Sequence, residues 1–199
     1  HHDGIDRGRG TMTRIVAGTL GGRRIAVPPG SATRPTSERV REALFSALQA
    51  SIGLDGARFL DLYAGSGAVG LEALSRGAGH VLLVESDARA ARVIRENIAT
   101  LRAAPAARLV TGRVAQVLAA APPDGQPYDI VFADPPYAVP DEQITTMLAA
   151  LADGGWLAAG ALVVIERATR DGPVTWVDPI TAERSRRYGE TTLWYGRRP

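Results

Sequence analysis

The 199-residue chain contains no cysteine and no lysine, and very little histidine. The lack of cysteine excludes disulfides and thiolate zinc sites. Two of the three histidines are the first two residues, so we expect no histidine metal site either. No apolar run approaches the roughly 20 residues of a membrane-spanning helix, and no signal peptide follows Met12. We therefore expect a soluble, cytoplasmic protein without a bound metal.

All 23 lysine-plus-arginine positions are arginine, although the net charge is only +2. A guanidinium binds phosphate through two parallel hydrogen bonds and stacks on bases, which an ammonium cannot do. A coding bias towards arginine accounts for most positions, and a solvated surface is the alternative role for each. Clusters near both chain ends are candidate nucleic-acid contacts: Arg23, Arg24, Arg34, Arg184, Arg186, Arg187, Arg197 and Arg198.

The length suits one sizeable domain with a small appendage. A hydrophobic content of 45% is enough to bury a core. Residues 1–11, with their two histidines and a Gly/Arg-rich stretch, are typical of an expression-tag remnant, and Met12 is the expected native start. We expect residues 12–52 to form an N-terminal hairpin and helix, and residues 53–199 to form the main domain.

Two β-prone runs between Arg14 and Val27 flank Gly21-Gly22, which indicates a hairpin. The segment after it predicts a helix, because Thr36 or Ser37 can cap its first turn. Apolar residues then recur on one face at helical spacing: Val40, Ala43, Leu44, Ala47 and Leu48.

From Arg58 onwards strand-like and helix-like segments alternate, which is typical of an α/β protein with a parallel sheet covered on both faces. The predicted strands are 58–61, 80–85, 108–111, 129–134 and 161–166, and the predicted helices are 68–75, 88–101, 114–120 and 142–152. Val174–Val177 and Thr191–Tyr195 are strand-like without a convincing helix between them. We expect them to pair antiparallel at one sheet edge.

The most informative segment is Asp134-Pro135-Pro136-Tyr137, which ends the apolar run Tyr128–Ala133. The two prolines stop a strand abruptly, because neither can donate a ladder hydrogen bond. The resulting stiff loop presents a carboxylate, free backbone carbonyls and an aromatic face. That set suits a planar ring with an exocyclic amino group, so these four residues are the candidate catalytic set. An ordinary turn after a strand is the alternative.

A glycine loop, Asp61-Leu-Tyr-Ala-Gly-Ser-Gly-Ala-Val-Gly70, follows the first strand of the main domain and opens its first helix. Glycines allow close backbone approach to a ligand, although helix packing also favours them there. Glu85 lies 24 residues beyond Asp61 and ends the second strand, where a carboxylate can accept both ribose hydroxyls. A nucleotide-type cofactor is therefore expected at this loop.

The negative charge of Asp61 opposes a diphosphate and suits a cationic ligand. S-adenosylmethionine carries an ammonium and a sulfonium and no phosphate. Tyr63 is placed to line the methionine portion, and Gly112-Arg113-Val114, after the third strand, is placed to meet the adenine. Arg113 cannot accept a bond from the adenine amino group, so a backbone carbonyl must do so if that contact exists.

With these residues the chain resembles the class I S-adenosylmethionine-dependent methyltransferases, and more closely the bacterial 16S ribosomal RNA guanine-N2 methyltransferases of the RsmD type. The two loops mark the wider superfamily, whereas the N-terminal hairpin and the helix after it are more specific. The resemblance spans nearly all of the chain after Met12 and rests on Arg14–Gly18, Gly22–Arg24, Arg34–Thr36, Arg39–Phe45, Asp61–Glu72, Asp134–Tyr137 and Tyr188–Thr191.

The resemblance implies a Rossmann-like fold: a seven-stranded, mostly parallel sheet with a reversed last strand and a small N-terminal extension. It implies S-adenosylmethionine as cofactor and, as substrate, a guanine of 16S ribosomal RNA, conventionally numbered 966, in partly or fully assembled 30S particles. No coiled-coil pattern indicates an oligomer, so we expect a monomer. The expected cofactor contacts are Thr36, Arg39, Asp61, Tyr63, Gly65, Ser66, Gly67, Glu85, Ser86, Gly112, Arg113, Val114 and Asp134.

Other readings of the same loops stay open. A DNA adenine-N6 or cytosine-N4 methyltransferase uses the same loop chemistry, but the chain has no obvious target-recognition domain. A protein glutamine methyltransferase usually begins this loop with asparagine. A non-catalytic RNA-binding assembly factor would not need an intact Asp134 loop, and a Rossmann-type oxidoreductase is disfavoured by Asp61.

Overall fold

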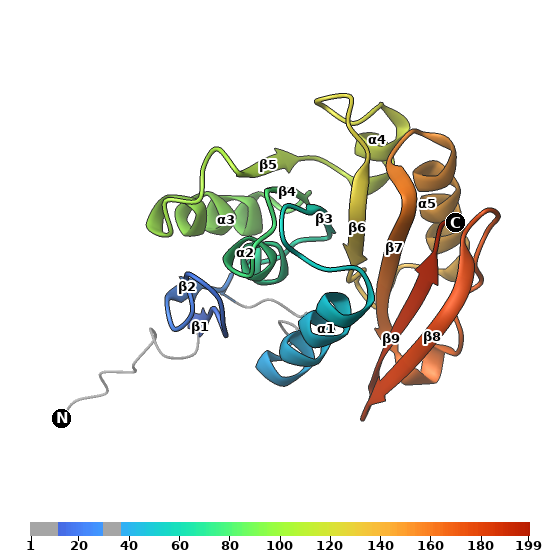
Figure 1. The fold of residues 1–199 in the computed structure, drawn as a ribbon, viewed down its shortest axis with the longest axis horizontal. Coiled ribbons are helices and arrows are strands. Elements are labelled where there is room, and N and C mark those ends of the chain that lie inside the picture. The colour runs from blue at the N-terminus through green and yellow to red at the C-terminus, as the bar shows by residue number, and fades with distance from the viewer. Residues whose placement is uncertain (1–11, 30–36) are drawn as a thin grey trace.

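A seven-stranded sheet forms the centre of the computed structural model, which describes residues 12–29 and 37–199 (Figure 1). Its strands are β3 (Arg58–Leu62), β4 (His80–Glu85), β5 (Ala107–Thr111), β6 (Tyr128–Ala133), β7 (Leu157–Ala168), β8 (Thr181–Tyr188) and β9 (Thr191–Arg197). Their order is β5-β4-β3-β6-β7-β9-β8. The neighbours from β5 to β7 are parallel, whereas β9 runs antiparallel to both β7 and β8. The expected mostly parallel sheet with a reversed last strand is confirmed.

Five α-helices connect or flank these strands in the described residues: α1 (Glu38–Ser51), α2 (Ala68–Ser75), α3 (Ala88–Thr100), α4 (Val114–Ala119) and α5 (Asp141–Asp153). The Oγ of Ser37 accepts from the N–H of Val40 and so caps α1, as the sequence predicts. None of these helices has the length and apolar character that crossing a bilayer requires.

Alternate residues of each central strand point into two different cores. On β4, Val81 and Leu83 pack with side chains of α1, α2 and α3, whereas Leu82 and Val84 pack with those of α4 and α5. The neighbouring strands β3, β6 and β7 divide their side chains in the same way. A strand buried on both faces is mostly apolar, which explains the nearly continuous hydrophobic runs of the sequence.

Two predictions for the C-terminal part of the chain are wrong, namely the start of one strand and the existence of another. β7 begins at Leu157 rather than Ala161, and the extra residues are accommodated by a register shift between Tyr128 and Ile130 of β6. Val174–Val177 is a loop, and the edge strand is β8. Residues 181–187 of β8 are exposed, so this strand lacks the apolar alternation by which strands are recognised.

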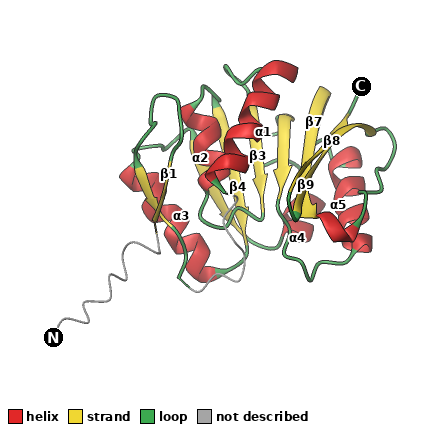
Figure 2. Ribbon diagram, turned by 90° about the horizontal axis from the view of Figure 1, so that it is seen from below, coloured by secondary structure: helices red, strands yellow, loops and turns green. Residues whose placement is uncertain are grey.

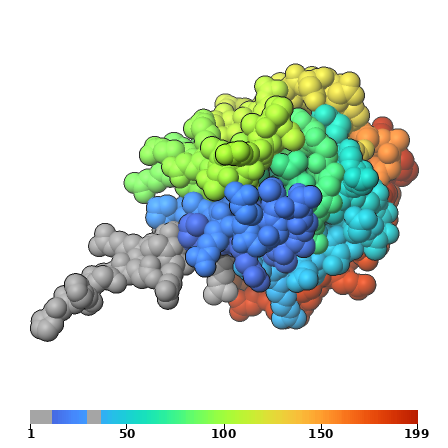
Figure 3. All heavy atoms as spheres, turned by 60° about the vertical axis from the view of Figure 1, so that its left-hand side comes forward, coloured from blue at the N-terminus to red at the C-terminus, as the bar shows by residue number. Residues whose placement is uncertain are grey.

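A short hairpin of β1 (Met12–Arg14) and β2 (Arg24–Ala26) lies beside the main sheet. Ile15 and Ile25 share one hydrophobic core with α1 and with β3, so the described parts of this segment, residues 12–29 and 37–52, pack into the core of the main domain. Figure 3 shows this hairpin packed against α3. It lies at the opposite end of the molecule from the β8–β9 pair (Figures 1 and 2).

A buried carboxylate, Glu72 of α2, attaches the hairpin to the main domain. Its two oxygens accept from the N–H groups of Val16 and Ala17, at 2.7 and 3.1 Å. They also accept from the Nε of Arg76 at 2.9 Å and lie 3.7 Å from the Nε of the buried Arg41 of α1. One side chain therefore joins the hairpin, α1 and α2.

Candidate active site

A cleft of about 900 Å³ opens where β3 and β6 end side by side. The chain runs outwards from β3 through β4 to β5 and then returns to β6 on the other side of β3. Such a reversal leaves a crevice at the carboxyl ends of the strands, which is where α/β sheets bind ligands. A volume of this size is within the range of cavities that take small molecules.

Asp61, on β3, lines the inner end of the cleft and is only 2% exposed. Its Oδ2 accepts from the N–H of Gly70 at 2.9 Å. Burial raises the pKa of the Asp61 carboxyl well above its usual value, the Gly70 N–H opposes this, and the nearby Glu85 carboxylate adds to it. A cationic ligand group placed here would relieve the cost of ionising Asp61.

The glycine loop after β3 approaches the cleft through Gly65. A Cβ on Gly65, whose φ is +61°, would meet no atom within 4 Å, so the backbone there faces open space. Gly70 differs, because a Cβ on it would lie 2.9 Å from the side chains of Leu83 and Val81. Gly65 thus leaves room for a ligand to approach the backbone, whereas Gly70 allows α2 to pack on β4.

Glu85 is held rigidly at the end of β4. Its Oε1 accepts from the N–H of Gly65 and its Oε2 from the N–H of Asp87, both at 2.8 Å. A carboxylate oxygen has room for a second bond, so both oxygens can also accept from a diol in the cleft. The geometry suits the ribose contact that the sequence predicts.

Ser66, Ser86, Arg113 and Val114, which the sequence predicts to contact a cofactor, also line the cleft. Gly67 and Gly112 lie just behind it: Gly67 precedes α2 in a left-handed conformation, and the N–H of Gly112 donates to the carbonyl of Glu85. Further residues line the cleft that no local sequence motif marks, among them Val27, Pro28, Pro29, Asp87, Arg89, Ala90, Phe132, Val139 and Gln143.

The Asp134 loop forms the opposite wall. The N–H of Asp134 donates to the carbonyl of Leu62 at 3.4 Å, which continues the pairing of β6 with β3. Asp134 and Pro136 line the cleft, whereas Pro135 is buried behind it. Tyr137 is 57% exposed at the outer tip of the loop and is not among the lining residues.

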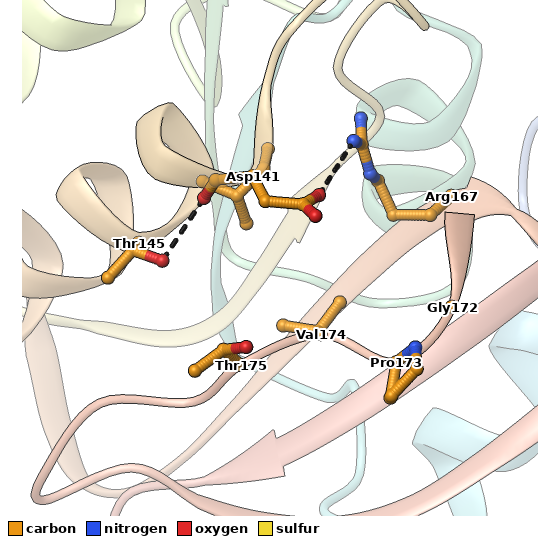
Figure 4. Close-up of a pocket in the computed structure, with 8 residues that line it drawn as sticks. Asp141, Thr145, Arg167, Gly172, Pro173, Val174 and Thr175 are labelled. Atoms are coloured by element: carbon orange, nitrogen blue, oxygen red, sulfur yellow. Dashed lines mark hydrogen bonds and ion pairs between the residues drawn. The ribbon is translucent and has the colours of Figure 1, made fainter.

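A buried arginine, Arg167 of β7, supports the far end of this loop. It donates to the carbonyl of Val139 at 3.0 Å and to the carboxylate of Asp141 at 3.3 Å. Figure 4 shows the pair between Arg167 and Asp141, together with the bond from Thr145 to the Asp141 carbonyl. The loop is therefore fixed at both ends, at Asp134 by β3 and at Val139 by β7.

Some predicted site residues lie elsewhere. Thr36 and Arg34 are outside the described residues. Arg39 is exposed on the first turn of α1 and does not line the cleft. Among the described residues there is no group of three or more histidine, aspartate or glutamate side chains that could hold a metal.

The candidate RNA-contacting arginines differ in their exposure and in their hydrogen bonds within the protein. Arg24 and Arg186 are exposed on β2 and β8, and Arg23 donates to the carbonyl of Thr100. Arg187 donates to the carbonyl of Gly189. Arg197 is occupied by structural bonds to Glu183, Ser51 and Gly160, so we remove it from the candidates.

Asn97 of α3 joins the hairpin to the glycine loop. Its side-chain NH₂ donates to the carbonyls of Ala26 and Ser66, and its oxygen accepts from the N–H of Ala26, all at 2.8–2.9 Å. The cleft-lining residues Val27–Pro29 follow directly after Ala26. Buried Asn97 therefore places the N-terminal segment against the glycine-loop side of the cleft.

We expect Asn97→Ala to lower the free energy of unfolding by about 1–3 kcal/mol, because it leaves buried backbone groups unpaired. It should also weaken ligand binding in the cleft by loosening Val27–Pro29. Urea denaturation and calorimetric titration measure the two effects. Glu96→Ala, at an exposed neighbouring position of α3, is the matched control. Equal stability of the two variants would show that the Asn97 bridge is unimportant.

The strand order and the cleft define a class I methyltransferase fold. With a TM-score of 0.63, the structure matches the magnesium protoporphyrin IX methyltransferase of Synechocystis PCC 6803, at 16% identity over 81% of this chain and 79% of that one. It matches the yhhF protein of Escherichia coli with a TM-score of 0.80, at 37% identity over 94% of this chain and 98% of that one.

Residues 13–197 match the family model described as conserved hypothetical protein 95. Over 167 residues the chain is 42% identical to the ribosomal RNA small subunit methyltransferase D of Escherichia coli K12, covering 82% of this chain and 80% of that protein. The chain belongs to this family and is a methyltransferase of the RsmD type.

Proposed function

We propose that the protein transfers the methyl group of S-adenosylmethionine to the exocyclic N2 of a guanine in 16S ribosomal RNA, conventionally position 966. The observation that carries this proposal is the meeting of two sets of groups in one cleft. Asp61 and Glu85 lie on one side, and the Asp134 loop lies on the other. A methyl donor and an amino-bearing base can therefore share the site.

The cofactor side fits S-adenosylmethionine. Asp61 is a buried carboxylate suited to the ammonium group, and Glu85 has two fixed oxygens for the ribose hydroxyls. Val114 and Val27 supply apolar surface nearby. The Synechocystis methyltransferase of the same fold has S-adenosylmethionine bound. When bound, this cofactor supplies an electrophilic methyl group on a sulfonium.

On the substrate side, we propose that the Asp134 loop binds and orients a weak nucleophile, the N2 amine of guanine. The N2 lone pair of guanine is delocalised into the ring, so the amine must be held in line at roughly 3–3.5 Å from the methyl carbon. We propose that the Asp134 carboxylate and the Pro135 carbonyl accept the two amino hydrogens. This orients the nitrogen and stabilises positive charge as it develops. Pro136 stiffens the loop, and Tyr137 stacks on the base.

Ribosomal RNA as substrate is supported by the name of the Escherichia coli relative. We propose that the 30S subunit or its assembly intermediate is the form bound. The hairpin that carries Arg23 and Arg24 and the β8–β9 pair that carries Arg186 and Arg187 lie at opposite ends of the molecule (Figure 1). The cleft is lined by residues at the ends of the central strands β3, β4 and β6. In this proposal residues 12–52 contribute both RNA contacts and, through Val27–Pro29, a wall of the cofactor site.

We also propose that the protein acts as a monomer in the cytoplasm, where ribosomal RNA is found. Among residues 12–29 and 37–199, the large exposed hydrophobic side chains are those of Met12 and Tyr137. Two separate side chains are too few for the apolar centre of a homodimer interface.

Product analysis tests the reaction. The protein is incubated with S-adenosylmethionine labelled in the methyl group and with 30S particles, naked 16S RNA, duplex DNA or total cell protein. We expect label in N2-methylguanosine from the ribosomal substrates alone. Label in N6-methyladenine or N4-methylcytosine of DNA would contradict the proposal and would identify the protein as a DNA methyltransferase. No transfer to any substrate would favour the assembly factor.

The affinity for S-adenosylmethionine should fall as the pH is lowered through the raised pKa of Asp61. Below that pKa the carboxyl is protonated and must release its proton to pair with the ammonium, so the association constant falls about tenfold per pH unit. Above it, this dependence disappears. Calorimetry in two buffers of different ionisation enthalpy measures the released proton. Asp61→Asn should bind weakly at every pH, and a pH-independent affinity of the unaltered protein would contradict the assignment.

A further inference from the structure

Tyr137, the exposed aromatic of the Asp134 loop, has a cation beside its ring. The Cζ of Arg170 lies 5.8 Å from the Tyr137 ring centroid. This distance is within the range of cation–π contacts. Within the part of the chain that the structure describes, the Arg170 guanidinium has no hydrogen bond or ion pair, and its side chain is exposed. Its N–H groups are thus available to a ligand.

The position of Arg170 is fixed by its neighbour, Thr169, in the short 3-10 helix η2 (Thr169–Asp171). The N–H of Thr169 donates to the carbonyl of Glu190 at 2.7 Å, and its Oγ1 bonds to the carbonyl of Gly189 at 3.1 Å and to the Oγ1 of Thr192 at 2.7 Å. Gly189, with φ +62°, forms the tight turn between β8 and β9. This turn lies in the segment Tyr188–Thr191, to which the reaction itself gives no role.

The same turn carries a second arginine. Arg187 donates from its Nε to the carbonyl of Gly189 at 2.9 Å, which leaves its terminal N–H groups free of hydrogen bonds in the described residues. The β8–β9 turn therefore holds Arg187 directly and Arg170 through Thr169. Of these two guanidinium groups, that of Arg170 lies over the aromatic ring of Tyr137.

This arrangement suits a nucleotide that leaves its base stack. A guanidinium on one face of Tyr137 leaves the other face for the base, and base–aromatic stacking contributes about 1–3 kcal/mol per base. The outer edge of the same guanidinium can donate to a phosphate of the displaced nucleotide. A flipped base and its phosphate would then be held by adjacent side chains.

We propose that Arg170 is a positioning residue for Tyr137 and binds a backbone phosphate next to the base that is methylated. The role of the Tyr188–Thr191 turn is to hold Arg170 in place. This inference rests on the proposed function, because it assumes a nucleic-acid substrate. It adds a substrate contact on η2 that lies outside both loops of the cleft.

The test compares Arg170→Gln, Arg170→Lys and a control, Arg102→Gln, in methylation of 30S particles at several salt concentrations. Arg102 is exposed on the turn after α3 and is not among the residues that line the cleft. We expect Arg170→Gln to raise the KM for the particles by about 3–10-fold and to reduce the slope of log affinity against log salt by about one. The affinity for S-adenosylmethionine and the melting temperature should not change.

Arg170→Lys distinguishes the two roles, because lysine keeps the charge without the planar stacking group. This variant should show the salt dependence of the unaltered protein. Its KM for the particles should lie between that of the unaltered protein and that of Arg170→Gln. In a Tyr137→Ala background, Arg170→Gln should raise the KM for the particles by a clearly smaller factor than in the unaltered protein, because the contact with the ring is already lost.

Additive effects of the two substitutions, or an Arg170→Gln variant that behaves like Arg102→Gln, would overturn the inference. The unaltered protein serves as the reference for the function itself. If it methylates 30S particles while Arg170→Gln shows no defect, only the role of Arg170 is wrong. If it methylates no nucleic acid, the proposed function fails and no comparison of variants is needed.

Discussion

Asp134→Ala is expected to lower the turnover number by about 10²–10³-fold, which is the usual loss when one preorganised charge-stabilising group is removed from an active site. The variant loses the carboxylate that, in the proposed reaction, accepts an amino hydrogen of the base and stabilises the positive charge developing on N2. The affinity for S-adenosylmethionine should largely persist, because Asp61 and Glu85 hold their positions through bonds to Gly70 and Gly65. Single-turnover methylation with labelled cofactor and a direct binding titration separate the two effects.

Asp134→Asn is the conservative variant for this test, and Asp153→Ala is the control. The amide keeps the shape and one acceptor oxygen without the charge, so an intermediate rate is expected. Asp153 is exposed at the end of α5, and its loss should leave the rate unchanged. Near-normal turnover by Asp134→Ala would remove this carboxylate from the mechanism.

Glu72→Ala is expected to destabilise the protein by about 3–5 kcal/mol, because it leaves the guanidinium of Arg41 buried without its counter-charge. Arg41 is fully buried, burial lowers its pKa, and the Glu72 carboxylate opposes that shift. The melting temperature should fall by roughly 6–20 °C. Because Glu72 also holds Val16 and Ala17, the hairpin should loosen and the cofactor affinity should drop.

An exposed ion pair of the same N-terminal region provides the contrast. The pair between Arg14 and Glu38 has side chains 59% and 43% exposed, and such pairs contribute about 0–1 kcal/mol. Glu38→Gln should therefore leave the urea midpoint nearly unchanged, whereas Glu72→Gln should retain part of the stability through its remaining acceptor. Similar midpoints for Glu72→Ala and Glu38→Gln would contradict the role given to the buried network.

The local sequence pattern was sufficient to predict the strands and helices in the central part of the fold. The strands β3 to β6 and the helices between them follow from apolar runs and caps, and Asp61, Glu85 and Asp134 could be placed at strand ends because parallel strands share one edge. Their common cleft follows from the strand order. The loop geometry could be anticipated because proline and glycine restrict or free the backbone locally.

Long-range contacts could not be anticipated in the same way. Val27–Pro29 follow Ala26, which is held by hydrogen bonds to Asn97, 71 residues later in the chain. The edge strand β8 was missed because its exposed residues show no periodic burial. Arg170 reaches Tyr137 through bonds between η2 and the β8–β9 turn, which no sequence pattern reveals.

The most direct test of the account is a crystal structure with S-adenosylhomocysteine, the demethylated product of the cofactor. We expect the ribose hydroxyls to bind Glu85, the amino group to lie beside Asp61 and the sulfur to face Asp134 across the cleft. A ligand bound outside the cleft, or one whose sulfur points away from the Asp134 loop, would contradict it.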